Sequence, residues 1–214
     1  MLALSLAGCG SGSSKETTTR APPAGPNPGA TLKAMLAAAR AGDATKLGNL
    51  LRPDSPDSLV PELMEGLGSY PASTPVVLSV RIDPRFAVAA LAGPRRAEGR
   101  REPLAAYAVA LQRYGNQYKA SLVSPVKIRP LGPDEGSTNG PVSQVAAEFS
   151  APVRVVQAGL WVDGKAIAAE PRGNPRTFTA FGSSGTLARG WHNVVAFAEA
   201  GGSALATAWT FRVR

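Results

Sequence analysis

Residues 190–213 read GWHNVVAFAEAGGSALATAWTFRV, and this stretch decides the fold of the carboxy-terminal part of the chain. Two apolar runs, 192–199 and 204–213, flank the glycine pair at 201–202. Adjacent glycines are a strong turn signal, because they accept backbone angles that other residues avoid. The stretch therefore predicts two strands separated by a turn.

Strand-like runs continue upstream from this pair, and helical periodicity is absent from residue 125 to the end. The runs are short, rich in β-branched or aromatic residues, and mostly separated by Gly, Pro, Asp or Asn. They span 125–130, 142–149, 153–156, 160–162, 166–169 and 177–181. In the last run of the chain, Trp209, Phe211 and Val213 share one face, which we expect to line a core. The run 125–130 is a first or connecting strand, and the roughly seven short strands after it predict an all-β sandwich over residues 125–214.

Three parts of this region carry a resemblance to a known family. LWVDGK at 160–165 contains Asp163-Gly164, the signal of a tight hairpin turn. LARGWHNV at 187–194 is similar to that family's Gly-x-His-x-Val entry into a late strand, and WTFRV at 209–213 is similar to its last strand. Together they resemble the bacterial immunoglobulin-like domains of surface and secreted proteins. The resemblance implies an immunoglobulin-like β-sandwich.

The preceding region, 30–124, begins with helical patterns. Leu32, Met35, Leu36 and Ala39 repeat at helical spacing, with Thr31 as the expected N-cap. Further cap and break signals divide the helical pattern into three helices. Gly42 ends the first, and Asp43 caps a short second helix that stops at Arg52-Pro53. Ser55-Pro56 begins a third helix, which ends near Gly66.

Strand patterns follow these helices. They span 76–82, 86–91, 104–114 and 117–123, with turns at 83–85 and at Gly115-Asn116. AAARAGD at 37–43, DPRFAV at 83–88 and the hairpin within 107–122 resemble the nuclear-transport-factor-like (cystatin-like) fold. That resemblance implies helices packed in the hollow of a curved antiparallel sheet. The expected fold class is thus an α+β domain over 30–124 plus an all-β immunoglobulin-like sandwich over 125–214.

The amino terminus carries the single cysteine of the chain. Leu6-Ala7-Gly8-Cys9 resembles the lipobox of bacterial lipoproteins, in which the cysteine thiol receives diacylglycerol. We expect 1–9 to be the remnant of a signal peptide, because no basic residue and few apolar ones precede Cys9. Residues 10–29 are rich in Ser, Thr, Gly and Pro and predict a flexible linker. These features predict a protein anchored by lipid on the outer face of a cell membrane, or secreted.

The net charge of +8 does not concentrate in one region. Residues 30–124 hold 12 basic against 8 acidic residues, and 125–214 hold 9 against 6. This spread argues against a nucleic-acid partner. The one dense cluster is RRAEGRRE at 95–102. We interpret it as a solvated hairpin loop, with Arg95, Arg96, Arg100 and Arg101 as candidate contacts to an anionic lipid, an acidic wall polymer or an envelope protein.

The residues available for chemistry are few. One Cys and one His exclude a disulfide framework and any multi-His or Cys-rich metal site, so we expect no metal and no cofactor. An isomerase in the α+β hollow would need an acidic base facing a hydroxyl donor. The carboxylates are Asp43, Asp83, Glu98 and Glu102, and the hydroxyls are Tyr107, Tyr114 and Tyr118. All four carboxylates fall in turns or caps, so no catalytic residue is assigned.

The sequence therefore predicts a cell-envelope protein with a non-catalytic binding or scaffolding role. High usage of Ala, Gly, Arg and Pro is typical of GC-rich coding and indicates an actinobacterial-type envelope. The alternative is a small-molecule or lipid carrier, or an isomerase-like enzyme, that uses the α+β hollow. His192 is expected to be a hydrogen-bonded residue at a turn or strand entry rather than a ligand.

Overall fold

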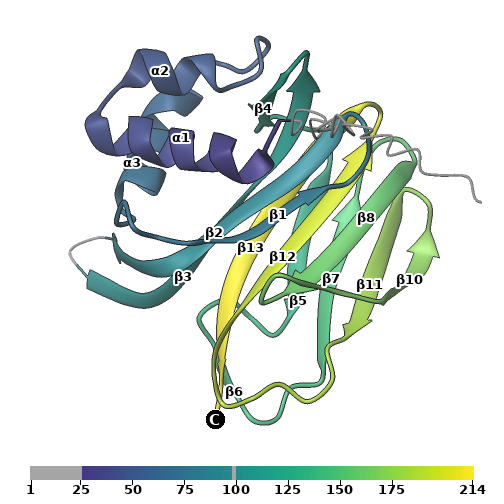
Figure 1. The fold of residues 1–214 in the computed structure, drawn as a ribbon. Coiled ribbons are helices and arrows are strands. Elements are labelled where there is room, and N and C mark those ends of the chain that lie inside the picture. The colour runs from purple at the N-terminus through teal and green to yellow at the C-terminus, as the bar shows by residue number, and fades with distance from the viewer. Residues whose placement is uncertain (1–25, 98–99) are drawn as a thin grey trace, which may run out of the picture.

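The computed structural model describes residues 26–97 and 100–214, without the side chains of residues 97, 100 and 101. In this part of the chain there are three helices and thirteen strands, so the fold is mainly β (Figure 1). The helices are α1 (Pro28–Ala41), α2 (Ala44–Asn49) and α3 (Leu59–Gly68). The strands form three sheets.

The first sheet is an antiparallel meander, and the other two face each other. The first holds β1 (Val76–Arg81), β2 (Phe86–Ala97), β3 (Arg100–Tyr114) and β4 (Gln117–Ser121) in that order. The second holds, in spatial order, β10 (Ala169–Asn174), β11 (Thr177–Ser183), β7 (Gln144–Ser150) and β5 (Lys127–Gly132). The third holds β6 (Thr138–Asn139), β13 (Ser203–Val213), β12 (Gly190–Ala200), β8 (Val155–Val162) and β9 (Lys165–Ile167).

Short polar side chains set the starts of α1 and α2. Asn27 caps α1 by accepting from the Gly29 and Ala30 amides, and Pro28 occupies the first turn, where its missing N–H costs nothing. The expected cap at Thr31 is therefore wrong. Asp43 caps α2 as expected, accepting from the Lys46 amide at 2.8 Å. The third helix begins four residues after the expected start at Ser55.

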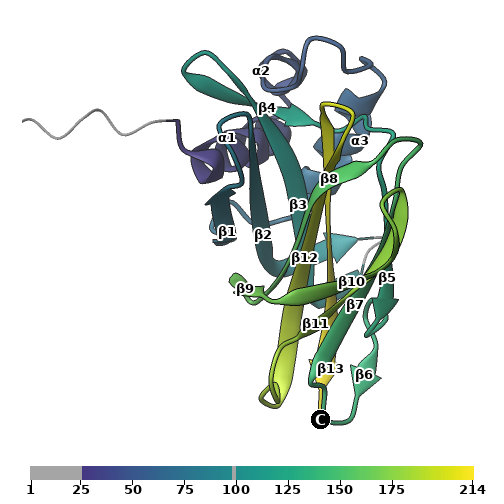
Figure 2. The same ribbon diagram turned by 90° about the vertical axis from the view of Figure 1, so that its right-hand side faces the viewer.

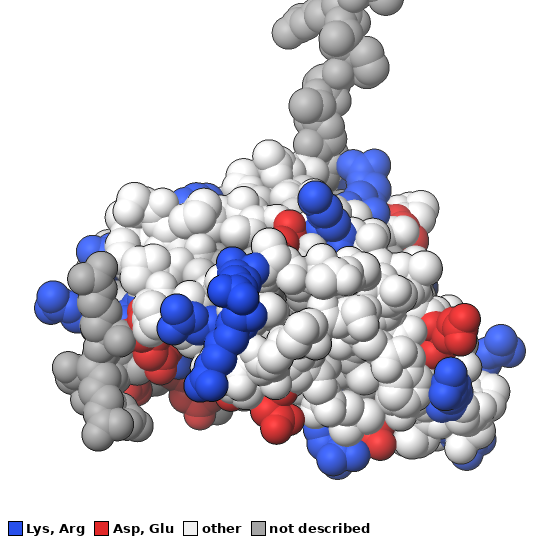
Figure 3. Space-filling view, turned by 90° about the horizontal axis from the view of Figure 1, so that it is seen from below, with Lys and Arg blue, Asp and Glu red and all other residues white. Residues whose placement is uncertain are grey.

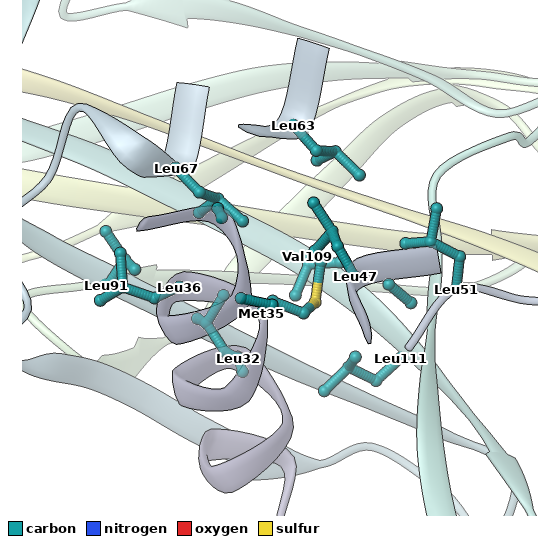
Figure 4. Packing of buried hydrophobic residues seen from close by; sticks show 14 of the residues in the cluster. Leu32, Met35, Leu36, Leu47, Leu51, Leu63, Leu67, Leu91, Val109 and Leu111 are labelled. Carbon is teal, nitrogen blue, oxygen red and sulfur yellow. The ribbon is translucent and has the colours of Figure 1, made fainter. Parts of the chain in front are cut away.

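The helices cover one face of the first sheet. Leucine and methionine side chains from all three helices meet apolar side chains of β2 and β3, as Figure 4 shows. The fully buried members include Leu32, Met35, Leu47, Leu67 and Leu111. Side chains therefore fill the space under the helices.

The second and third sheets enclose a separate core. Phe149 of β7 faces Trp209, Phe211 and Val213 of β13 across it. The shared inward face of these three β13 residues is confirmed. The turn at Asp163-Gly164 is also confirmed, since both residues have positive φ angles of 49° and 75°.

The expected fold class is wrong. The first sheet is an inner layer rather than the wall of an α+β domain followed by an immunoglobulin-like domain. Its face opposite the helices packs against the third sheet through a further apolar cluster (Figures 1 and 2). Phe86 and Val88 of β2 there meet Trp161 of β8 and Val195 and Phe197 of β12.

Polar contacts reinforce this interface between sheets. Thr210 Oγ1 donates to the Leu104 carbonyl of β3 at 3.3 Å, and Ser121 Oγ donates to the Ala204 carbonyl of β13 at 3.1 Å. Strand β12 is buried on both faces, which explains why residues 192–200 carry no exposed position. The helices, the first sheet, the third sheet and the second sheet thus form four successive layers.

Candidate functional site

The arginine cluster lies on two paired strands. In the β2–β3 register, Arg95 faces Glu102, Arg96 faces Arg101, and Ala97 faces Arg100. The expected solvated loop is therefore wrong for these positions, because the ladder runs through them. The side chains of Arg100 and Arg101 and the residues 98–99, including the candidate base Glu98, lie outside the described residues.

Arg95 is held by neighbours on two elements. Its Nε donates to Glu102 Oε2 at 2.5 Å and its Nη2 donates to Glu102 Oε1 at 3.3 Å. Its guanidinium also lies 5.9 Å from the centre of the Tyr70 ring, in a cation–π contact. The hydrogen bonds to Glu102 raise the pKa of Arg95, with further attraction from Tyr70 and Glu135. The charge of Arg95 is thus largely balanced.

Arg40 and Arg96 approach the same place from two other directions. Arg40 ends the last turn of α1, and its Nη1 donates to the Tyr70 carbonyl at 2.5 Å. The Arg96 amide donates to the Ser69 carbonyl at 3.2 Å, which ties β2 to the end of α3. Both arginine side chains are exposed.

These residues line a hollow of about 520 Å³, called the arginine hollow below. Its lining consists of Arg40, Gly68, Ser69, Pro71, Pro94, Arg95 and Arg96. None of these described lining residues is acidic. The structure thus brings two of the four predicted contact arginines together with Arg40, which sequence reasoning missed. On the face in Figure 3, basic and acidic side chains lie interspersed.

The acid–base pair that an isomerase would need is not assembled among the described residues. Asp43 caps α2, Asp83 accepts from the Arg85 and Phe86 amides, and Glu102 binds Arg95. Burial raises the pKa of Tyr107, and the neighbouring Tyr70 raises it further. No carboxylate contributes to that shift.

Two buried tyrosine hydroxyls lie in the same apolar cluster. The hydroxyls of Tyr70 and Tyr118 make no hydrogen bond with the described residues. Burial raises the pKa of Tyr70 to about 12. The Tyr70 hydroxyl therefore stays protonated at neutral pH and cannot serve as a base there. Tyr114, the other candidate hydroxyl, ends β3 beside the Gly115 turn.

His192 lies at the start of β12 and is bonded on both ring nitrogens. Nδ1 donates to Asp163 Oδ2 at 2.7 Å and Nε2 donates to the Ala188 carbonyl at 2.8 Å. Both partners are acceptors, so the imidazolium form, which carries hydrogen on both nitrogens, satisfies both bonds. Burial lowers the pKa of His192, but the bonds to Asp163 and Ala188 outweigh it and raise the pKa overall. The expectation of a locally hydrogen-bonded residue is confirmed.

Glu199 is a buried carboxylate that sequence reasoning missed. Its side chain is 3% exposed, and Arg85 Nη2 donates to Glu199 Oε1 at 2.7 Å across the interface between sheets. Burial raises the pKa of Glu199, and Arg85 partly offsets that rise. The sequence did carry a signal for it: Glu199 is a charged residue in the apolar run 192–199, and a buried charge needs a partner of opposite charge.

A second opening lies at the edge of the two facing sheets. It has a volume of about 370 Å³ and is lined by β8, β10 and β11, with Phe178 among its apolar lining residues. Val156, on the same edge, is 62% exposed. The Val155 amide closes one end by donating to the Pro175 carbonyl at 2.8 Å.

The described residues contain no group of three or more His, Cys, Asp and Glu side chains arranged to hold a metal ion. None of their helices has both the length and the apolar character needed to cross a bilayer. Cys9, the predicted lipidation site, lies outside the described residues.

Comparisons with known proteins give only distant similarities. No protein-family model and no curated protein matches the chain. Among solved structures, the methionine-rich copper resistance protein PcoC from Escherichia coli is 18% identical over 40% of this chain and 99% of its own, with a TM-score of 0.29. An endo-β-1,4-mannanase from Thermotoga petrophila is 9% identical over 43% of this chain and 20% of its own, with a TM-score of 0.34. The titin tandem A164–A165 is 7% identical over 61% and 89%, with a TM-score of 0.29. Scores this low carry no argument about fold or activity.

Proposed function

We propose that the chain is an exported, lipid-anchored protein of the cell envelope with a non-catalytic binding role. The anchor is a diacylglycerol on Cys9, joined by the linker to the first helix. The arginine hollow is the contact surface, and its partner is an anionic component of the envelope. The observation that carries this proposal is that Arg40, Arg95 and Arg96 line one open hollow, whose described lining residues include no acidic side chain.

The packing under the helices supports binding at the surface over chemistry or transport inside. A carrier or an isomerase of the expected kind needs a chamber between the helices and the first sheet. Leu32, Met35, Leu47 and Leu67 fill that space with fully buried side chains. The carboxylates that could act as a base instead cap turns or bind arginine. The surface hollow, by contrast, is open to a large partner.

Lipid anchoring is tested by expression in a bacterial host, membrane fractionation and mass spectrometry of the amino-terminal peptide. We expect a chain that begins at Cys9 and carries acyl chains, found in the membrane fraction. The variant Cys9→Ser should move to the soluble fraction with its fold unchanged. A membrane-associated wild-type chain that retains residues 1–8 without acylation would contradict the anchor.

Partner binding is tested separately by sedimentation with isolated envelopes. The Cys9→Ser chain, which cannot be anchored by lipid, should still bind through the arginine hollow. This binding should weaken as ionic strength rises, because salt screens the attraction between exposed charges. The screening length is about 8 Å at 0.15 M. Binding that does not respond to salt would contradict an electrostatic contact.

A further inference from the structure

We infer that the arginine hollow is a binding site for a phosphate group, as found in phosphodiester polymers and phospholipid head groups. The inference rests on the proposed function and names the ligand of its contact surface. Three observations carry it: the charge balance of the hollow, the different elements from which its arginines come, and the carboxyl ends of two helices that border it.

The charge balance leaves two positive charges without a described acidic partner. Arg95 is neutralised by its two hydrogen bonds to Glu102. Among the described residues, neither Arg40 nor Arg96 forms an ion pair. Both side chains are exposed at the rim of the same hollow. Glu135 also acts on Arg95 through its charge, so among the described residues one positive charge remains in excess, and a ligand group with one negative charge matches it.

The directions of the guanidinium groups favour phosphate over carboxylate. Arg40 comes from the last turn of α1 and Arg96 from β2, so guanidinium groups from two different elements border the hollow. A carboxylate has two oxygens in one plane and is matched by one guanidinium fork. A phosphate group presents tetrahedral oxygens, so forks from more than one direction can bind it at once.

The helix ends at this hollow make the arginines indispensable. Gly68 and Ser69 belong to the carboxyl end of α3, and Arg40 ends α1. Carboxyl ends of helices carry partial negative charge, which attracts arginine and repels an anion. The Ser69 and Tyr70 carbonyls are already satisfied by the Arg96 amide and by Arg40. Binding of an anion must therefore depend on the side chains of Arg40 and Arg96.

The test uses the full chain with Cys9→Ser, so that lipidation does not contribute. Inorganic phosphate and acetate are titrated in parallel, and the amide signals of Gly68 and Ser69 are followed by NMR. Soluble poly(glycerol phosphate) is compared with poly-glutamate of equal charge. Phosphatidylglycerol vesicles are compared with vesicles that carry the same charge as fatty-acid carboxylates. These arms separate the polymer source from the lipid source.

The variant R40Q/R96Q removes the two charges and leaves the Arg95–Glu102 pair intact. The matched control R154Q/R176Q removes two exposed arginines of the facing sheets, so its net charge is the same. We expect R40Q/R96Q to lower the affinity for phosphate ligands by about tenfold or more, and the control to change it by less than about twofold. The single variant R96Q removes no described side-chain contact and serves if the double variant is unstable.

Three results would overturn the inference or the proposal on which it rests. Equal responses to phosphate and acetate, and to both polymers, would refute the phosphate site and leave the anionic contact standing. Equal losses in R40Q/R96Q and in the control would refute the hollow as the site. Binding of free phosphate at Gly68 and Ser69 without binding of any vesicle or polymer would keep the phosphate site and refute the envelope partner.

Discussion

The substitution Phe197→Ala tests whether the helix-covered sheet and the facing sheets behave as one structure. Phe197 is 0% exposed and lies in the cluster that joins β12 to β2. Truncating a buried phenylalanine removes its transfer free energy and leaves a cavity, at a cost of about 3–5 kcal/mol. For a chain of this size, that loss corresponds to a fall in Tm of roughly 6–20 °C.

The chain carries separate spectroscopic reporters for its two parts. All three tryptophans, Trp161, Trp191 and Trp209, lie on β8, β12 and β13. All described helices lie between residues 28 and 68. Urea unfolding followed by tryptophan fluorescence and by helical circular dichroism should therefore give coincident transitions in the wild type. In Phe197→Ala both midpoints should fall together.

A shift confined to one reporter would refute the layered packing. If the tryptophan midpoint fell while the helical midpoint stayed in place, the first sheet would not depend on the third. Phe149→Ala is the matched control, because Phe149 is equally buried but faces the core between the second and third sheets. It should lower stability by a similar amount, about 3–5 kcal/mol.

Three further predictions concern single residues. The pKa of His192 is raised in the folded state, so the stability that its protonated ring contributes should be complete below the unfolded value of 6.5 and be lost as pH rises through the folded value. Urea unfolding at several pH values should show a fall in the free energy of unfolding of no more than about 3 kcal/mol, and this fall should be absent in His192→Gln. Gly164→Ala should destabilise the protein by about 1–3 kcal/mol in urea unfolding, because φ is +75° and the new Cβ would clash with the Val77 carbonyl oxygen. Gly66→Ala is the control: its Cβ meets open space in α3, so it should stabilise the protein by about 0.5–1 kcal/mol. Burial raises the pKa of Glu199, so the wild type should lose stability relative to Glu199→Gln as pH rises from 4.5 through the folded value; parallel pH profiles without divergence would contradict this.

Local features were predictable because local physics determines them. Asp43 caps a helix through its own side chain, and Asp163-Gly164 turns the chain through two positive φ angles. Trp209, Phe211 and Val213 were assigned to one face by the period of two. Each of these assignments needs only a few consecutive residues.

The packing of one sheet against another depends on contacts between residues far apart in the sequence, which a few consecutive residues do not reveal. The run 192–199 was interpreted as a strand, and its continuous apolar character is typical of a strand covered on both faces, but the run itself does not say which sheet covers the second face. The Arg85–Glu199 ion pair joins residues 114 positions apart, and the hydrogen bond from Arg40 to the Tyr70 carbonyl joins residues 30 positions apart. The first cap was misplaced because Thr31 and Asn27 are both good caps, and Pro28 decides for the earlier one.

Photo-crosslinking from the arginine hollow in isolated envelopes tests the central claim most directly. A photoreactive amino acid at Pro71, an exposed lining residue, leaves all three arginines in place. The same group at Pro152, which is also exposed, serves as the control on the facing sheets. The account predicts crosslinks from position 71 to a phosphate-bearing polymer or lipid, suppressed by added phosphate. Equal crosslinking from position 152, or crosslinks from position 71 that added phosphate leaves unchanged, would contradict it.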